Sequence, residues 1–424
     1  MAAERRRLTG LDTAFLSLER AVTPMQLGSL AVFRSDRPMR AEAVARLLAD
    51  RARRLPRLGR RVQPAWFPPG TATWAEDPGF IPEEHIRLHQ LDAPAGTGQA
   101  AELAAELMAQ PLRRDRPLWE LHVMAGLDDD RFAVLTKLHH ALGDGLAALE
   151  IGIGMLDAVT PAGASAAERN GRPRAVARAV ASQSRKMSRG RKLTPRRILS
   201  RPFQLANGVR TAAGGAVGQA AEMVGMAASV LGSARLPSPG SPLVVMSSGR
   251  RGLGLARLDL QQVRRIRAHF GGTVNDVLLA VVAGALRDWF SGRGHEVDGL
   301  RLRALIPVSR RARSGRRSGG NELSGYLCEL PVDEPDPSRR LRAIQAAMLQ
   351  SKAAGTTRGP GAIPLLAARL PPALHRVVAP VAGQVASLLF DILVTSVPMP
   401  GTSLRLGGAE LTEVFPIAPL APGH

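Results

Sequence analysis

Cysteine is almost absent from this sequence, since Cys328 is the single one among 424 residues. A disulfide framework and a zinc site built from cysteines are therefore both excluded, and the composition fits a reducing cytoplasm. Runs of eighteen or more strongly apolar residues are absent as well, so we expect no transmembrane helix. The basic N-terminus lacks the apolar stretch of a secretory signal. These absences together favour a cytoplasmic location.

Aromatic residues are also scarce, at 4% with one tyrosine, so stacking surfaces for single-stranded nucleic acid are few. The formal net charge of +21 suits anionic partners in general. Only four of the 57 basic residues are lysine, and such a bias toward arginine is what a GC-rich genome produces by default. No recognition helix or zinc-finger pattern is present. We therefore expect no specific nucleic-acid partner.

A Gly-x-Ser-x-Gly turn is missing too, so the sequence offers no serine nucleophile of the hydrolase type. What it does contain is Leu-His-His-Ala-Leu-Gly-Asp-Gly at residues 138–145. A β-prone stretch precedes this motif and an apolar helical pattern follows it, which predicts a strand, a tight loop and a helix. Because side chains alternate along a strand, His139 and His140 are expected to point in opposite directions.

Histidine at the end of such a strand suits general-base catalysis. A neutral imidazole takes a proton from a hydroxyl or amine, which then attacks an activated acyl group. Asp144 stands directly before the helix and can cap its N-terminus, while Gly143 and Gly145 permit backbone geometries that other residues resist. A buried histidine pair that only packs is the alternative. The four fixed positions of His-His-x-x-x-Asp-Gly favour the catalytic interpretation.

The chain is long enough for two domains, and its composition divides it into residues 1–159, 160–245 and 246–424. Within the middle segment, residues 169–201 hold twelve basic side chains and no acidic one, and residues 211–234 are alanine- and glycine-rich with one charge. Two interpretations stay open. The segment either contacts an anionic membrane surface through basic residues and a weakly apolar helix, or is a solvated linker whose helix packs across the domains.

The third part, residues 246–424, is predicted to begin with a strand at Leu253–Leu260. A long helix follows, with Thr273 or Asn275 near its start as the cap. Asn275 and Asp276 are adjacent polar residues on an otherwise apolar helix. They are either a simple N-terminal cap or part of a site.

Several motifs together resemble the bacterial wax ester synthase/diacylglycerol acyltransferase family. They are Leu11-Asp12 with Thr23-Pro24-Met25, Asp115-Arg-Pro-Leu-Trp-Glu120, the His-His-x-x-x-Asp-Gly motif, Asn275-Asp276, Pro307-Val-Ser309 and Thr395-Ser-Val-Pro-Met-Pro400. The resemblance covers about residues 8 to 420. Gln26 replaces a frequent histidine, and Ser396 and Met399 replace asparagine and glycine. The C-terminal domain is expected to be shortened at its end compared with the family.

The resemblance implies a fold of the α/β (α+β sandwich) class, with two chloramphenicol-acetyltransferase-like domains over a channel, joined by a long basic, partly helical linker. It also implies transfer of a long acyl chain from acyl-CoA to the hydroxyl of diacylglycerol or a fatty alcohol. His140 is then the general base, supported by His139, and Asp144 holds the loop. Gly145 leaves space for the acyl chain, and Asn275 lines the channel to position substrate. CoA enters as a substrate, and neither a metal nor another cofactor is expected.

Two other functions share these features. A condensation-type or short-acyl CoA-dependent transferase would carry the same histidine motif, although the Pro-Leu-Trp-Glu run favours the lipid family. The altered Ser396 and Met399 and the shortened end also fit a catalytically inactive, lipid-associated basic protein. In each case, the basic charge suits peripheral contact with the inner face of the plasma membrane or with lipid droplets.

Overall fold

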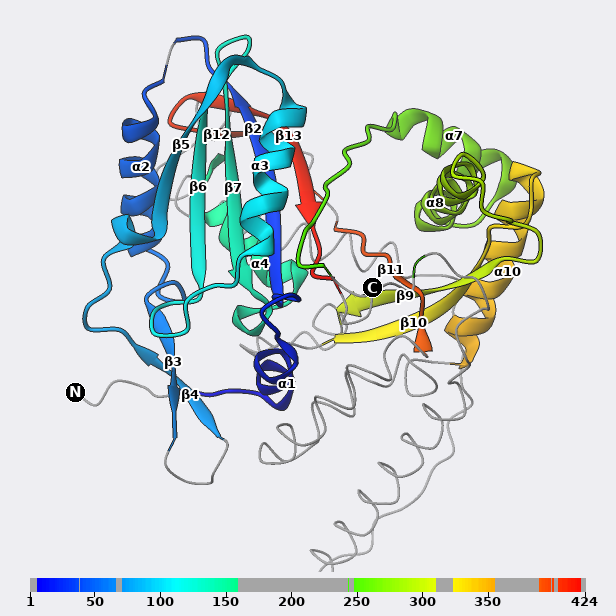
Figure 1. Cartoon of the computed structure of the whole chain (residues 1–424), viewed down its shortest axis with the longest axis horizontal. Helices are drawn as coiled ribbons and strands as arrows, with labels where there is room; N and C mark the ends of the chain where they lie inside the picture. The colour runs from blue at the N-terminus through cyan, green and yellow to red at the C-terminus, as the bar shows by residue number, and fades with distance from the viewer. Residues whose placement is uncertain are drawn as a thin grey trace, which may run out of the picture.

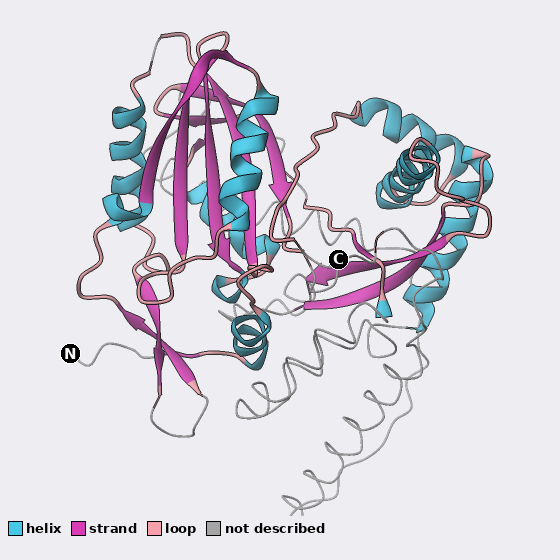
Figure 2. Ribbon diagram, viewed as in Figure 1, coloured by secondary structure: helices cyan, strands magenta, loops and turns pink. Residues whose placement is uncertain are grey.

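The computed structural model describes residues 6–37, 39–65, 71–158, 243, 248–309, 323–354, 389–397, 399 and 403–420. These residues form two mixed α/β bodies that lie side by side (Figures 1 and 2). The middle segment predicted at 160–245 falls almost wholly outside the described residues. Its two interpretations, and the division of the chain into three parts, therefore stay predictions.

The larger body is built on a seven-stranded sheet in the order β5-β6-β7-β2-β13-β12-β8. All neighbouring pairs are antiparallel except β5 and β6. The strands are β2 (Gln26–Arg34), β5 (Ile86–Ala95), β6 (Trp119–Leu127), β7 (Arg131–His139), β8 (Asp157–Ala158), β12 (Leu404–Leu406) and β13 (Ala409–Ile417).

Helices cover both faces of this sheet, so its strands bury side chains on both sides. Phe132 and Val134 share a core cluster with α2 (Ala41–Arg53), whereas Ala133 and Leu135 share one with α3 (Thr97–Ala109). This alternation is the two-residue period of a strand. The short helical turns η1 (Pro82–His85) and η2 (His140–Leu142) and the helix α4 (Gly145–Gly154) complete this body.

A small sheet and a helix close the lower end of the larger body in Figure 1. Its strands are β1 (Arg6–Arg7), β3 (Arg60–Pro64) and β4 (Ala72–Glu76), in the order β1-β4-β3. The helix α1 (Gly10–Leu18) begins with a capping box in which Thr9 and Asp12 each bind the other's backbone N–H. α1 packs against η2, which places it beside the histidine motif.

The smaller body has a three-stranded sheet covered by helices. The order is β10-β9-β11, with β9 (Arg301–Ser309) and β10 (Leu323–Pro331) antiparallel and β11 (Ile392–Leu393) parallel to β9. The helices are α7 (Leu260–Phe270), α8 (Val274–Ser291) and α10 (Pro337–Ala354). Of the helices described, none is by itself long and apolar enough to cross a membrane; the bent pair α7–α8 meets the test of length and composition together.

The strand predicted at Leu253–Leu260 is wrong, because residues 251–259 run as a loop. The apolar alternation that suggested a strand is real, since Leu253 and Leu255 pack against the cluster under α3. No hydrogen-bonded ladder joins this segment to a described strand. Alternate burial therefore arises here from packing across the two bodies rather than from membership in a sheet.

The last described strand returns to the first sheet. β13 lies antiparallel to β2, with Leu411 opposite Phe33 and Phe415 opposite Leu30. Figure 1 shows the red β13 beside the blue β2. Residues near the two ends of the chain therefore form the centre of one sheet, which ties the C-terminal segment to the larger body.

Candidate active site

The histidine motif has the strand–loop–helix structure that its sequence predicts. β7 ends at His139, η2 carries His140, and α4 begins at Gly145. Asp144 is fully buried, and its Oδ1 accepts the backbone N–H of Ala147 at 3.0 Å, which makes Asp144 the N-cap of α4. The capping role predicted for Asp144 is confirmed.

His140 faces the interior of the protein. Its ring stacks on the ring of Phe15 from α1, with centroids 3.9 Å apart and planes inclined by 17°. Its backbone N–H donates to the carbonyl of Met25 at 2.8 Å, just before β2 begins. Only 8% of the residue is exposed. Phe15 and Met25 thus fix the ring and the backbone of His140 from neighbouring elements.

A cavity of about 330 Å³ opens beside His140. Its wall is largely apolar and comes from one face of the large sheet, from α4, from the β12–β13 region and from the smaller body. The residues contributed by the smaller body are Pro307, Leu393, Thr395, Ser396, Val397 and Met399. An apolar space that ends at an imidazole suits a reactant with a long hydrocarbon chain and one reactive polar group.

Gly145 lies in the cavity wall at the first turn of α4. A Cβ atom at this position would lie 3.7 Å from Cγ2 of Val397 across the cavity. A longer side chain would therefore fill the space between α4 and the smaller body. Ser396 and Met399, the two departures from the family pattern, lie in the same wall.

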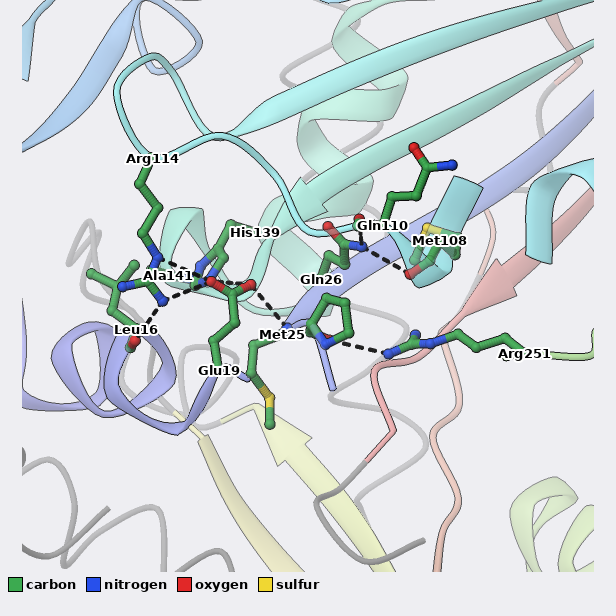
Figure 3. A network of polar contacts seen from close by, with 11 residues as sticks. Leu16, Glu19, Met25, Gln26, Met108, Gln110, Arg114, His139, Ala141 and Arg251 are labelled. Atoms are coloured by element: carbon green, nitrogen blue, oxygen red, sulfur yellow. Dashed lines mark hydrogen bonds and ion pairs between the residues drawn. The ribbon is translucent and has the colours of Figure 1, made fainter. Parts of the chain in front are cut away.

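His139 points away from the cavity, as the alternation of a strand predicts. Its Nδ1 accepts the backbone N–H of Ala141 at 3.0 Å, so in the neutral ring the proton is on Nε2. That Nε2 lies 3.5 Å from Oε1 of Glu19, and the residue is 1% exposed (Figure 3). His139 is thus held between the loop of the motif and Glu19, the first residue after α1.

Glu19 joins several elements around the motif. Its Oε1 accepts the backbone N–H of Met25 at 3.2 Å, and its Oε2 accepts Nη2 of Arg114 at 2.7 Å. Burial raises the pKa of Glu19, but its interactions with His139 and Arg114 outweigh burial and lower the pKa to about 2. Glu19 is therefore ionised at neutral pH.

The hydrogen bonds of Gln26 explain why glutamine can replace the frequent histidine of the family pattern. Its buried Nε2 donates to the carbonyls of Met108 at 2.9 Å and Gln110 at 2.6 Å, at the C-terminal end of α3. A neutral imidazole has a single N–H and could not donate to both. The amide at position 26 thus ties α3 to the start of β2.

Asn275 lies in the first turn of α8, half-buried, and does not line the cavity. The prediction that Asn275 lines the channel therefore finds no support in this geometry. Its neighbour Asp276 forms a capping box with Thr273, whose backbone N–H donates to Oδ2 at 2.7 Å. Thr273 and Asp276 thus start a helix in the smaller body, because their side chains satisfy free backbone N–H groups of its first turn.

An ion pair joins β6 to β7 just before the histidine motif. Lys137 on β7 is 1% exposed and bonds to Oε2 of Glu120 on β6 at 3.1 Å. Burial lowers the pKa of Lys137. Burial also raises the pKa of Glu120, yet bonding to His122 and Lys137 brings it down to about 2. The β6–β7 pair therefore includes an ion pair two residues before His139.

Sequence reasoning missed Phe15, Glu19 and Arg114 as part of the site. They lie 25 or more residues from the histidines along the chain, and no local pattern links them to the motif. Their only signal is that Phe15 and Glu19 are four residues apart, which places them on one side of a helix end. No cluster of three potential metal ligands occurs among the residues whose placement is described.

Comparisons with known proteins agree with this architecture. Residues 8–278 match the wax ester synthase/diacylglycerol acyltransferase catalytic domain, and residues 319–424 match the WS/DGAT C-terminal domain. A probable diacylglycerol O-acyltransferase of Mycobacterium tuberculosis is 33% identical over 98% of this chain and 86% of its own length. A putative diacylglycerol O-acyltransferase of Mycobacterium bovis is 31% identical over 97% of this chain and 88% of its own.

Solved structures confirm the predicted fold class. The wax ester synthase/diacylglycerol acyltransferase of Marinobacter aquaeolei VT8 superposes with a TM-score of 0.62 and 21% identity, over 98% of this chain and 88% of that one. The first condensation domain of the CDA synthetase superposes with a TM-score of 0.53 and 16% identity, over 98% of this chain and 86% of that one. Both are two-domain folds of the chloramphenicol-acetyltransferase type.

Proposed function

The chain belongs to the wax ester synthase/diacylglycerol acyltransferase family, and from this membership we propose that it moves a long-chain acyl group from acyl-CoA to a lipid hydroxyl. The acceptor is diacylglycerol, giving triacylglycerol, or a fatty alcohol, giving a wax ester. The observation that carries this function is the position of His140 in the wall of an otherwise largely apolar cavity.

In the proposed mechanism, His140 acts as the general base. Its imidazole takes the proton of the acceptor hydroxyl, and the resulting oxygen nucleophile attacks the thioester carbonyl. Collapse of the tetrahedral intermediate breaks the carbon–sulfur bond and releases CoA. The imidazolium returns its proton to the departing thiolate, so the enzyme ends in its starting state. CoA is a substrate in this scheme, and the steps require no metal or further cofactor.

The other motif residues support this chemistry without touching the proton in transfer. Asp144 holds the start of α4 through Ala147. His139 anchors the loop from the opposite side of the strand. Gly145 has no side chain to fill the cavity, so an acyl chain can lie between α4 and Val397. A contact in the structure supports each of these proposed roles.

Diacylglycerol is the acceptor that we propose, because the two mycobacterial relatives are named for it. The test is release of CoA from palmitoyl-CoA by the purified protein, with diolein, hexadecanol or no acceptor, and with identification of the product lipid. We expect triacylglycerol to form faster than palmityl palmitate. Faster ester formation with hexadecanol would overturn the acceptor assignment. Absence of turnover with either acceptor would overturn the acyltransferase assignment and favour an inactive lipid-associated protein.

We also propose peripheral contact with anionic membranes or lipid droplets. The net charge of +21 and the apolar nature of both lipid substrates support this contact. The test is flotation of the protein with vesicles of phosphatidylcholine alone and with added phosphatidylglycerol. We expect flotation only with the anionic vesicles, weakening as salt increases. Equal recovery with both kinds of vesicle, or with neither, would overturn the electrostatic contact.

A further inference from the structure

The contacts of Glu19 point to a role that no sequence motif assigns to it. One carboxylate oxygen, Oε1, lies 3.2 Å from the backbone nitrogen of Met25 and 3.5 Å from Nε2 of His139. The carbonyl of Met25 in turn accepts the backbone N–H of His140 at 2.8 Å. Figure 3 shows Glu19 facing both His139 and Met25. The same oxygen thus connects to His139 directly and to His140 through the backbone of Met25.

The second oxygen of Glu19 is fixed by Arg114. Nε and Nη2 of Arg114 lie 3.1 and 2.7 Å from Oε2, and Nη2 also donates to the carbonyl of Leu16 at 2.8 Å. Leu16 is in the last turn of α1, whereas Arg114 is in the loop after α3. The guanidinium therefore locks the carboxylate to two elements and limits its rotation.

The same helix end fixes the ring of His140. Phe15, one turn before Glu19, stacks on that ring at 3.9 Å. The side chain of Glu19 is 5% exposed, so water does not compete strongly for its oxygens. Residues at the end of α1 thus contact the motif in two places. Phe15 stacks on the ring of His140, and the carboxylate of Glu19 faces Nε2 of His139.

We propose that Glu19 is a positioning residue for the reaction, which orients His140 by fixing the tautomer of His139 and the backbone of Met25. The carboxylate favours a proton on Nε2 of His139. Nδ1 is then free to accept the N–H of Ala141, which shapes the turn that carries His140. Glu19 does not line the cavity, so it acts through its neighbours rather than on substrate. This role rests on the proposed function of His140.

The test compares Glu19→Gln with wild type in the acyl transfer assay. Glutamine keeps an oxygen for Met25 but removes the charge that faces His139 and Arg114. We expect kcat to fall by about tenfold to a hundredfold, as for other residues that orient a reacting group. KM for palmitoyl-CoA should change by less than about twofold, because ground-state binding is untouched. A folded Glu19→Gln protein with wild-type kcat would overturn the proposal.

Arg114→Gln tests the same proposal by removing the guanidinium that binds Glu19, and Arg113→Gln is its matched control. Arg113 is adjacent and pairs with Asp115 on the surface, with 63% and 59% of the two side chains exposed. We expect Arg114→Gln to lower kcat and Arg113→Gln to leave it unchanged. In the double variant Glu19→Gln/Arg114→Gln, the fold loss in kcat should be smaller than the product of the two single losses, because both changes break one network. Equal effects of the two arginine variants would contradict the proposal.

A spectroscopic measurement separates positioning from general stability and needs no substrate. Nitrogen-15 shifts of labelled histidines, with His139→Gln for assignment, distinguish the two neutral tautomers. We expect protonation at Nε2 of His139 in wild type and a larger share of the Nδ1-protonated form in Glu19→Gln. Protonation of His139 mainly at Nδ1 in wild type would overturn the positioning role, even if the protein were an active acyltransferase. The expected tautomers without turnover would instead overturn the proposed function alone.

Discussion

At the scale of single residues, the two adjacent histidines have different surroundings because His139 ends β7 and His140 begins η2, with their side chains pointing in different directions. His140 faces the cavity against Phe15, and His139 faces Glu19 with 1% of its surface exposed. Of the two histidines, only His140 lines the cavity. The proposed general base and the residue that anchors its loop are thus neighbours in sequence with separate surroundings.

Cys328 gives a residue-scale prediction. It is 1% exposed in the core of the smaller body, and burial raises its pKa to about 12. Thiolate is therefore scarce at neutral pH, and the thiol is unreactive in the folded protein. We expect no reaction with Ellman's reagent at pH 7.5 until denaturant is added, and then one thiol per chain. Rapid reaction of the native protein would show that this core is open.

Glu19 and Glu120 predict how stability depends on pH. In the folded protein both pKa values are about 2, against 4.5 for the free side chain. The folded state therefore binds these protons less readily than the unfolded state. The stability that they contribute is complete above pH 4.5 and is lost as the pH falls toward 2.

Urea unfolding between pH 6 and pH 3 measures this effect. We expect the free energy of unfolding to fall with pH in wild type and to fall less steeply in Glu19→Gln and Glu120→Gln. Each variant removes one carboxylate whose protonation destabilises the fold. Identical pH dependence in wild type and both variants would contradict the low pKa values.

At the scale of elements, the strand, loop and helix around the histidines could be predicted from sequence. Residues 131–139 alternate on the two faces of a strand, and Asp144 stands where a helix cap is required. These features depend on neighbours along the chain, so the sequence shows them directly. The same holds for the helix that begins after Thr273.

Non-local contacts could not be predicted in this way. β13 pairs with β2 across more than 370 residues of sequence, and Glu19 reaches His139 across 120. Which strands pair depends on the packing of the whole fold, and the local sequence of a strand does not specify its partner. The segment at Leu253–Leu260 failed as a predicted strand for the same reason, since alternation shows burial but not pairing.

The Lys137–Glu120 pair gives a prediction for the β6–β7 hairpin. Removing one partner leaves a poorly compensated charge within the sheet, which costs about 3 kcal/mol or more for a buried pair. We expect Lys137→Met to lower the free energy of unfolding by an amount of that order. Adding Glu120→Gln should recover part of the loss, because no charge is then left behind. A double variant less stable than Lys137→Met would contradict a direct pairing.

At the scale of the whole molecule, both bodies contribute residues to the wall of the cavity. Its wall needs the sheet, α4, the C-terminal strands and the smaller body at once. The β13 strand covers the edge of β2, and residues after β11 line the cavity from the other side. Activity is therefore expected to require the chain as a whole rather than the part that carries the histidines.

A fragment of residues 1–159 tests this dependence. Without β13, the strand β2 becomes an exposed edge that carries apolar side chains such as Leu30 and Phe33. Such edges pair with other chains, so we expect the fragment to aggregate while the full chain stays dispersed, as measured by size-exclusion chromatography. Addition of a separate fragment 246–424 should reduce aggregation if β13 can pair in trans. A monomeric, folded fragment 1–159 would contradict the role of β13.

The measurement that tests the central claim most directly is the rate of CoA release by His140→Ala with palmitoyl-CoA and diolein. His269→Ala is the matched control, because His269 is an exposed histidine on α7 outside the cavity. We expect folded His140→Ala to lose at least about a hundredfold in kcat, whereas His269→Ala keeps the wild-type rate. A wild-type rate in folded His140→Ala would contradict general-base catalysis by His140.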